Sequence, residues 1–201
     1  LSHVVMGDVA PDRSSFKTKD VGYALESSDP WFRPVDIQVG PDGAIYVADM
    51  YGQRIDHTSH YQGRIHKESG RIYRLRAKGD NSSPPRFDLA TQSTGKLIDL
   101  LHVEDNKWAR QAIQHELYRR NVIDSTDLLA DEISSATGQA ALEFLWALHM
   151  ASGISDERAS KLLGHADPYV RLWMVRLACD DGDVSKQLAE KLADLAYREP
   201  H

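Results

Sequence analysis

The chain has 201 residues, enough for one large domain or two small ones. It is 41% hydrophobic and 27% charged, the balance of a folded globular protein, and no apolar run approaches the ~20 residues that cross a bilayer. The net charge of −6 argues against a nucleic-acid-binding protein. A single cysteine, Cys179, excludes an intrachain disulfide, a zinc site built on several thiolates and covalent haem attachment.

The composition changes near residue 85. Eight of the 13 glycines precede residue 80, and six of the 8 prolines precede residue 86. The segment from Lys78 to Pro85 is rich in turn-forming residues and cannot continue a strand or a helix. We therefore expect two regions, residues 1–78 and 94–201, joined by a linker at residues 79–93.

The first region has the pattern of short β-strands. The clearest evidence is the turn Gly40-Pro41-Asp42-Gly43, which stands between two segments rich in apolar residues and predicts a hairpin. Residues 51–70 form a polar loop of about 20 residues, and loops of that length are usually functional or disordered. Strands are predicted at residues 2–6, 16–25, 35–39, 44–48 and 71–76.

The second region has apolar residues at helical spacing, with capping residues at the expected starts. The segments Asn106–Arg110 and Asp167–Arg171 match each other at an offset of 171 − 110 = 61 residues, or two periods of about 30. This match favours two-helix repeats that stack on one another, and an irregular bundle with a chance match is the alternative. Helices are predicted at residues 97–103, 108–118, 126–133, 139–151, 156–163, 168–179 and 185–197.

Three motifs carry a family resemblance: Phe32-Arg33-Pro34, Gly40-Pro41-Asp42-Gly43-Ala44 and Gly70-Arg71-Ile72-Tyr73-Arg74. With them, residues 1–180 resemble the bacterial "membrane-bound dehydrogenase domain" proteins, which are similar to soluble glucose dehydrogenase. The resemblance implies β and α structure in separate regions. The terminal blades of a β-propeller would precede an α-helical HEAT-like solenoid, and in the family a cytochrome c domain often follows.

The chain departs from the family pattern in two respects. A propeller needs about four to eight blades of four strands each, and residues 1–78 supply fewer than two, which would leave sheet edges bare. The Cys-x-x-Cys-His motif is absent, so no haem is expected in this chain. The chain also begins at Leu1 without a secretion signal. We therefore expect a fragment, with most of any dehydrogenase site located before Leu1.

Polar side chains concentrate in two loops of the first region. If residues 16–25 end one blade and residues 35–39 and 44–48 begin the next, the loops at 27–33 and 49–70 open on the same face of the propeller. The Gly40–Gly43 turn would lie on the opposite face. The candidates on the shared face are Asp29, Arg33, Asp49, Tyr51, Arg54, Asp56, His57, His60, His66, Lys67 and Glu68.

Three histidines, His57, His60 and His66, are the sharpest cluster on this face. Imidazoles on one loop suit a metal ion or a general base, or with Arg54 and Arg64 an anionic cofactor. A solvated histidine-rich loop is the alternative. We take His57 and His60 as catalytic candidates, and His66 and Arg54 as cofactor-binding candidates.

Two further candidates stand where the loops meet the strands. Asp49 follows a strand directly, and its carboxylate either binds Ca²⁺ or caps the next turn. Arg33 is the third cofactor-binding candidate, because a guanidinium can bind a carboxylate or phosphate through two hydrogen bonds. A structural salt bridge from Arg33 to Asp36 or Asp49 is the alternative.

The resemblance implies a sugar or alcohol dehydrogenase with a quinone cofactor such as PQQ, Ca²⁺ and an extracytoplasmic, periplasmic location. A base such as His57 or His60 would take the proton of a carbohydrate hydroxyl, and an arginine would stabilise the cofactor oxyanion. The alternative is a non-catalytic propeller that binds carbohydrate or protein, with the helical repeats as a docking surface for a protein partner. No nucleic-acid partner and no membrane span are expected, and the chain alone is expected to be inactive.

Other conspicuous side chains are expected to be structural. The aromatic residues and Cys179 fit buried positions in the two cores, and a stacking platform for sugar is the alternative for Trp31, Tyr46 and Tyr73. Arg110 and Arg171 are expected to form ladders between repeats with Asp105 or Asp167. The aromatic residues in question are Trp31, Tyr46, Tyr73, Trp108, Trp146 and Trp173.

Overall fold

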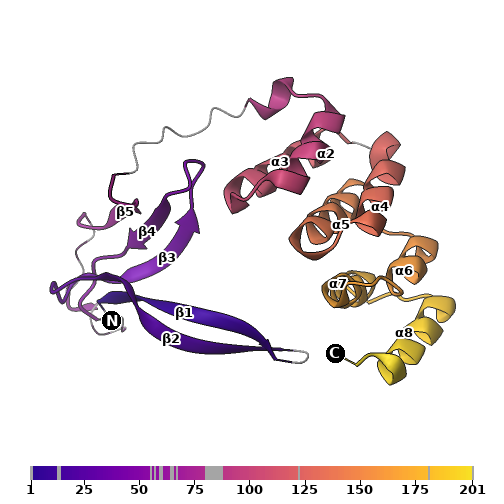
Figure 1. Cartoon of the computed structure of the whole chain (residues 1–201). Helices are drawn as coiled ribbons and strands as arrows, with labels where there is room; N and C mark the ends of the chain where they lie inside the picture. Colours follow the sequence, from indigo (N-terminus) through magenta and orange to yellow (C-terminus); the bar gives the residue numbers. More distant parts are fainter. Residues whose placement is uncertain are drawn as a thin grey trace. The chain divides into compact units, whose positions relative to one another are not determined.

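A computed structural model describes residues 2–12, 15–54, 56, 58, 61–63, 66, 68–79, 88–121, 123–180 and 182–200. The chain divides into two compact units, Leu1–Pro85 and Arg86–His201. The described strands, β1 to β5, all lie in the first unit, and helices α2 to α8 lie in the second (Figure 1). The predicted order, a β region followed by an α region, is confirmed.

The first unit contains two small antiparallel sheets. Strands β1 (His3–Asp12) and β2 (Ser15–Glu26) pair in a ribbon. Strands β3 (Pro34–Val39), β4 (Ile45–Asp49) and β5 (Arg71–Leu75) form the second sheet, in the order β3-β4-β5. The predicted hairpin is therefore present as β3 and β4.

The turn of this hairpin depends on its two glycines. Gly43 has a φ of +72°, a backbone conformation that favours glycine. A Cβ on Gly40 would lie 2.3 Å from the Tyr46 ring, so a side chain there would displace Tyr46. The Gly40 N–H donates to the Ala44 carbonyl (2.9 Å), which closes the turn.

The ribbon is longer than the sequence predicted, because β1 continues from the expected residues 2–6 to Asp12. Most side chains of both strands are exposed on both faces. Without a buried face, the strands lack the apolar–polar alternation that identifies a strand in a sequence. The ribbon is therefore held by backbone pairing rather than by a core of its own.

The second unit consists of seven α-helices among the described residues, as predicted. Most of them begin with a capping side chain, such as Asn106, whose Oδ1 accepts from the Trp108 N–H (2.8 Å). The elements are η1 (Leu89–Thr91), α2 (Thr94–Val103), α3 (Lys107–Arg119), η2 (Ile123–Ser125), α4 (Thr126–Ser135), α5 (Gly138–Ser152), α6 (Asp156–Leu162), α7 (Pro168–Ala178) and α8 (Lys186–Arg198).

Within this unit the helices alternate between two rows. Helices α2, α4, α6 and α8 follow one another along one side, and α3, α5 and α7 along the other (Figure 1). One continuous hydrophobic core runs between the rows, from Leu97 in α2 to Leu188 in α8. Helix α5 lies at its centre, where Phe144, Leu145 and Leu148 are fully buried. In the part of the chain that the structure describes, no helix is long and apolar enough to span a bilayer.

Two residues that were expected to be buried in this unit are exposed. Trp108 is 39% exposed, because it lies in the first turn of α3, just before the first buried residue, Ala109. Cys179 is exposed because it caps the end of α7, outside the buried stripe of Val170 and Met174. In contrast, Trp146 and Trp173 pack against the core as expected, edge to face, with ring centroids 5.0 Å apart.

Candidate functional site

Asp49, the last residue of β4, joins the two loops in which the candidate residues lie. Its Oδ1 accepts from the backbone N–H groups of Arg33 and Tyr51, each at 2.8 Å. Across the sheet Asp49 pairs with Pro34, the first residue of β3. The loop before β3 and the loop after β4 therefore open at the same end of the sheet. Asp49 is only 4% exposed, and its Oδ2 has no hydrogen-bond partner among the described residues.

Arg33 holds the start of the long loop in place. Its Nε donates to the Gly52 carbonyl (2.9 Å) and its Nη2 to the Gln53 carbonyl (2.5 Å). The guanidinium thus forms a structural clasp, although its partners are backbone carbonyls rather than the Asp36 or Asp49 carboxylate. These two bonds use two of the five N–H donors of the guanidinium, so three remain for other partners.

Trp31, Tyr51 and His66 come from three chain segments and form what we call the aromatic cluster. The Trp31 and Tyr51 rings stack at a centroid distance of 5.9 Å and an angle of 28°. The His66 ring stands edge-on to both, 4.6 Å from Trp31 and 5.9 Å from Tyr51. Trp31 and Tyr51 are half-buried and His66 is exposed, so the cluster lies at the surface of the unit.

The prediction that Trp31 belongs to the blade core is wrong. The neighbouring Phe32 takes the core position instead, at 4% exposure and with its ring against Tyr73 (5.6 Å). Asp29 turns the chain at this point, because its Oδ1 accepts from the Trp31 N–H (2.9 Å) and its carbonyl from the Phe32 N–H (3.1 Å). Trp31 is thereby directed into the loops.

Two charged side chains flank the aromatic cluster. The Tyr51 hydroxyl donates to the Asp29 carboxylate, and the Arg71 guanidinium lies 5.4 Å over the Tyr51 ring. Burial, followed by the bond to Asp29, raises the pKa of Tyr51 above its ordinary value. The Tyr51 phenol therefore stays protonated at neutral pH and remains a hydrogen-bond donor.

The other predicted site residues are less closely gathered. Arg54 pairs with Asp56 (2.5 Å), and its side chain is 78% exposed. His66 belongs to the aromatic cluster, and its Nδ1 lies 3.5 Å from the Ser69 hydroxyl. His57 and His60, like Arg64 and Lys67, lie outside the described residues.

Sequence reasoning preferred a core position for Trp31 over a sugar-stacking role, and it did not include Arg71 among the candidates. Their positions in the sequence could have identified both residues. Trp31 lies within the loop at 27–33, and Arg71 is the first residue after the loop at 49–70. A loop tryptophan gives no periodic pattern that separates a surface position from a core position.

The family resemblance implies a calcium ion, which needs oxygen ligands from the chain. Ca²⁺ takes about six to eight oxygen ligands. The orphaned Asp49 Oδ2 suits one of them. Within the described ranges, however, no three His, Cys, Asp or Glu side chains gather as a metal-binding group.

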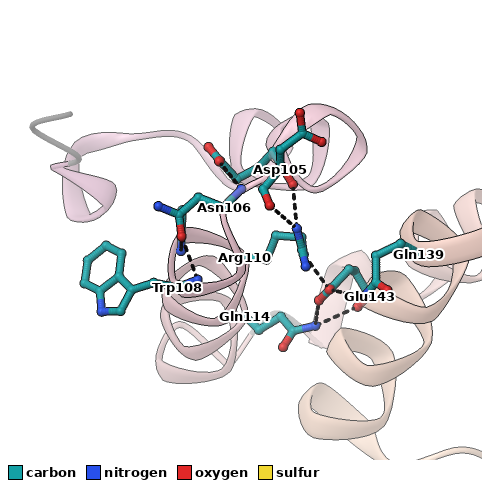
Figure 2. Close-up of polar contacts among 9 residues, drawn as sticks. Asp105, Asn106, Trp108, Arg110, Gln114, Gln139 and Glu143 are labelled. Carbon is teal, nitrogen blue, oxygen red and sulfur yellow. Dashed lines mark hydrogen bonds and ion pairs between the residues drawn. The ribbon is translucent and has the colours of Figure 1, made fainter. Parts of the chain in front are cut away.

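A second polar group lies in the helical unit, between α3 and α5 (Figure 2). Glu143 of α5 is 4% exposed. Its Oε1 accepts from Arg110 Nε (2.7 Å) and Gln139 Nε2 (2.6 Å), and its Oε2 from Gln114 Nε2 (2.6 Å). Both carboxylate oxygens are thus paired, which is the requirement for burying a charge.

Arg110 and Arg171, which lie two repeat periods apart, make equivalent contacts with backbone carbonyls. Arg110 Nη1 donates to the carbonyls of Glu104 (3.1 Å) and Asp105 (2.7 Å). Arg171, 61 residues further on, donates in the same way to His165 and Ala166. Each arginine therefore holds the loop that precedes its own helix.

The carboxylate partners of these arginines differ from the prediction. Arg110 pairs with Glu143, and Arg171 pairs with Glu199 through two bonds of 2.6 Å. The Asp167 carboxylate is instead used by two backbone N–H groups, those of Tyr169 (2.8 Å) and Gly138 (2.6 Å). The contacts of Glu143, Arg171 and Asp167 join helices to one another, and these side chains are already paired. We therefore take the aromatic cluster of the first unit as the candidate ligand site.

A protein-family model described as a domain of unknown function, DUF7133, matches residues 5–79. The chain is thus similar to that family over the strands and both loops of the aromatic cluster, and the helical unit lies outside the match. No curated protein and no solved structure matches the chain.

Proposed function

We propose that the chain is the junction between a β-propeller and a HEAT-like helical array in a protein of the sugar- and alcohol-dehydrogenase-like type. The aromatic cluster carries this proposal. Aromatic rings and charged groups of both signs converge there from three segments at one end of a sheet. Such convergence of rings with a few placed polar groups is typical of small-molecule sites.

The sheet β3-β4-β5 supports the propeller part of the proposal. It is a three-stranded antiparallel meander, and its two outer strands are edges within the described residues. Apolar side chains on these strands are exposed, among them Val35 (55%), Ile37 (48%) and Ile72 (74%). Neighbouring blades would cover such side chains, and a closed ring would protect the strand edges.

The alternating rows of the helical unit support the HEAT-like part. Arg110 and Arg171 make equivalent carbonyl contacts two periods apart, which fits a repeated two-helix element. Stacked repeats expose an extended surface, and this surface is proposed to dock a protein partner.

The proposed reaction of the whole protein is the oxidation of a carbohydrate hydroxyl to a carbonyl, in an extracytoplasmic compartment. PQQ, assisted by Ca²⁺, would supply the two-electron acceptor. His57 and His60 are the proposed bases that take the hydroxyl proton. Among the described residues, those of the aromatic cluster would contribute contacts to the carbohydrate.

The test uses the full-length protein that contains this chain, supplied with PQQ and Ca²⁺ and a panel of sugars. We expect reduction of an artificial electron-acceptor dye, and a loss of at least about 100-fold when His57 and His60 are both replaced by alanine. The exposed His115→Ala variant is the matched control. The absence of dye reduction with every sugar would refute the dehydrogenase proposal.

A non-catalytic carbohydrate-binding propeller is the second candidate. It is favoured by the self-paired charges around the aromatic cluster, which suit recognition without supplying a free base. Quinone bound to the purified full-length protein separates the two candidates, because only the dehydrogenase needs it.

A further inference from the structure

We propose that the α3-α5-α7 row of the helical unit docks an acidic peptide segment of a protein partner, with aromatic side chains among its carboxylates. The surface, which we call the row face, is formed by Trp108 and Tyr118 of α3, Trp146 of α5, and Leu172 and Arg176 of α7. The inference rests on the proposed docking role of the helical array, for which it names the face and the partner chemistry. It does not require the dehydrogenase reaction.

The residues of the row face occupy equivalent positions on their helices. Counted from the N-cap residue of each helix, they stand at positions 2, 5, 9 and 12, and Trp146 and Arg176 share position 9 because 146 − 137 and 176 − 167 both equal 9. Positions separated by three and four residues lie on one side of a helix. In α3 the opposite side is the buried one, with Ala109, Ile113 and Leu117 at positions 3, 7 and 11.

The row face is exposed at α3 and at α7. Trp108 is 39% exposed, Tyr118 59% and Leu172 48%. Arg176 is also exposed, and Trp146 of the middle helix is half-buried. Tryptophan, tyrosine and arginine are the side chains that most often dominate the binding energy between proteins. The composition of the row face therefore suits a protein partner.

Arg176 is the group that would bind a carboxylate of the partner. Its guanidinium lies 4.9 Å over the Trp173 ring, and Trp173 packs edge to face against Trp146 at 5.0 Å. The N–H donors of a guanidinium lie at its edges, so contact with a ring leaves them available. Among the described residues, no acceptor is bonded to the Arg176 side chain. The guanidinium is thus restrained by the ring and still able to bind a carboxylate through two hydrogen bonds.

The charge of the row favours an acidic partner. Helices α3, α5 and α7 carry five Lys or Arg and two Glu, 5 − 2 = +3, whereas α2, α4, α6 and α8 carry six Lys or Arg and eight acids, 6 − 8 = −2. Both acids of the α3-α5-α7 row are paired, Glu116 with Arg119 and Arg120, and Glu143 with Arg110. No unpaired carboxylate therefore remains on these three helices, all of whose residues are described. An acidic segment is attracted to this row rather than to the other.

The experiment titrates the 201-residue chain into a fluorescein-labelled peptide built from the repeat Glu-Glu-Tyr and follows fluorescence anisotropy. A peptide built from Lys-Lys-Tyr is the control of opposite charge. We expect the acidic peptide to bind with a Kd below about 100 μM. The affinity should fall at least about threefold between about 50 mM and 300 mM salt, because screening weakens the attraction of exposed charges. The basic peptide should bind at least about tenfold more weakly.

Two variants on different helices locate the binding surface. Arg176→Gln should weaken binding at least about fivefold, because it removes the charged donor, and Tyr118→Ala should weaken it at least about threefold. The matched control is Arg198→Gln, which removes an arginine of α8 whose side chain is 76% exposed, and it should leave the affinity unchanged. Circular dichroism checks that each variant keeps its helices, and either of the two row-face variants suffices if the other fails to fold.

Four results would overturn the inference. They are no binding of the acidic peptide at about 1 mM chain, equal binding of the basic peptide, tighter binding of the polysaccharide polyanion heparin, and an affinity that neither Arg176→Gln nor Tyr118→Ala changes. Sedimentation of the chain alone tests a further occupant, because a dimer that Arg176→Gln dissociates would assign the row face to a second copy and overturn the inference as well.

This proposal and the proposed dehydrogenase fail separately. Peptide binding that depends on Arg176, without dye reduction by the full-length protein, would refute the dehydrogenase and keep the docking surface. Dye reduction by the full-length protein, without peptide binding, would refute the docking surface and keep the dehydrogenase.

Discussion

Arg110 and Arg119 lie on the same helix, α3, and each pairs with a glutamate in a different environment. The Arg110 and Glu143 side chains are 15% and 5% exposed, whereas the Arg119 side chain is 66% exposed. Removing one partner of a buried pair leaves an uncompensated charge, at a cost of about 3–5 kcal/mol, and exposed pairs contribute about 1 kcal/mol or less.

We therefore predict that Arg110→Ala lowers the free energy of unfolding of the chain by about 3–5 kcal/mol. The matched control, Arg119→Ala, should lower it by much less, because the side chain of Arg119 is exposed to solvent. Urea unfolding followed by far-UV circular dichroism measures both values. Equal losses in the two variants would show that the Arg110–Glu143 pair is not a buried packing contact.

Glu116 gives the residue-scale prediction for pH. Its bonds to Arg119 and then Arg120 lower its pKa from 4.5 to about 2. Because the folded-state pKa lies below the unfolded value, the resulting stability is fully present above about pH 4.5 and is lost as the pH falls toward about 2. Arg120 also donates to the Leu89 and Gln92 carbonyls, so this charge group holds η1.

The expected result is that wild type is more stable than Glu116→Gln by a constant margin between about pH 7 and pH 5. That margin should shrink between about pH 4.5 and pH 2. Urea midpoints of both proteins across this range provide the measurement. A margin that stays the same down to about pH 2.5 would contradict the assignment.

Residue types predicted burial and contacts only in part. The recurrence of Arg110 at Arg171 indicated a bridging role, but their partners Glu143 and Glu199 lie 33 and 28 residues away and depend on how helices pack. Trp31 and Phe32 are adjacent and both apolar, and only the turn at Asp29 decides which of them is buried.

At the scale of elements, Asp167 does more than cap its own helix. Its carboxylate accepts from Tyr169 N–H in α7 and from Gly138 N–H at the start of α5. Burial raises the pKa of Asp167, but the backbone donors Gly138, Tyr169 and Val170 and nearby His165 outweigh it, so the pKa is lowered. Ser185 caps α8 through a single bond to Leu188 N–H (3.2 Å).

Asp167→Ala should therefore destabilise the chain more than Ser185→Ala does. Loss of an N-cap costs about 1 kcal/mol, and loss of a hydrogen bond to a charged group adds about 1.5–3 kcal/mol. Chemical denaturation of the two variants in parallel measures the difference. If Ser185→Ala costs as much as Asp167→Ala, the bond to Gly138 contributes nothing.

Helices and strands were predicted well where the sequence has periodic apolar residues, a helix-capping residue or a recognisable turn. The seven α-helices of the described residues have apolar stripes, and several begin at a Ser, Asn or Asp whose side chain caps the first turn. The strands β3 and β4 flank a recognisable turn. The ribbon of β1 and β2 was underestimated because exposed strands carry no alternating pattern.

At the scale of the whole molecule, the two units differ in how complete their cores are. The helical core contains residues of that unit alone. The strands of the first unit leave Val35, Ile37 and Ile72 exposed. This contrast predicts different behaviour when the units are expressed separately.

Residues 86–201 alone should keep a helical circular dichroism spectrum and unfold in one cooperative transition. Residues 1–85 alone should associate or aggregate, because exposed apolar strands and bare edges promote pairing. Light scattering and thermal unfolding of the two pieces test this. A monomeric, cooperatively folded first unit would mean that its sheets need no further blades.

If the first unit is part of a β-propeller, the coding sequence immediately upstream of Leu1 encodes further blades. We expect an open reading frame that continues for several hundred residues, with short strands separated by turns similar to Gly40-Pro41-Asp42-Gly43. A start codon directly before Leu1 would contradict it. The first unit would then be a small sheet domain, and the dehydrogenase proposal would give way to a binding module.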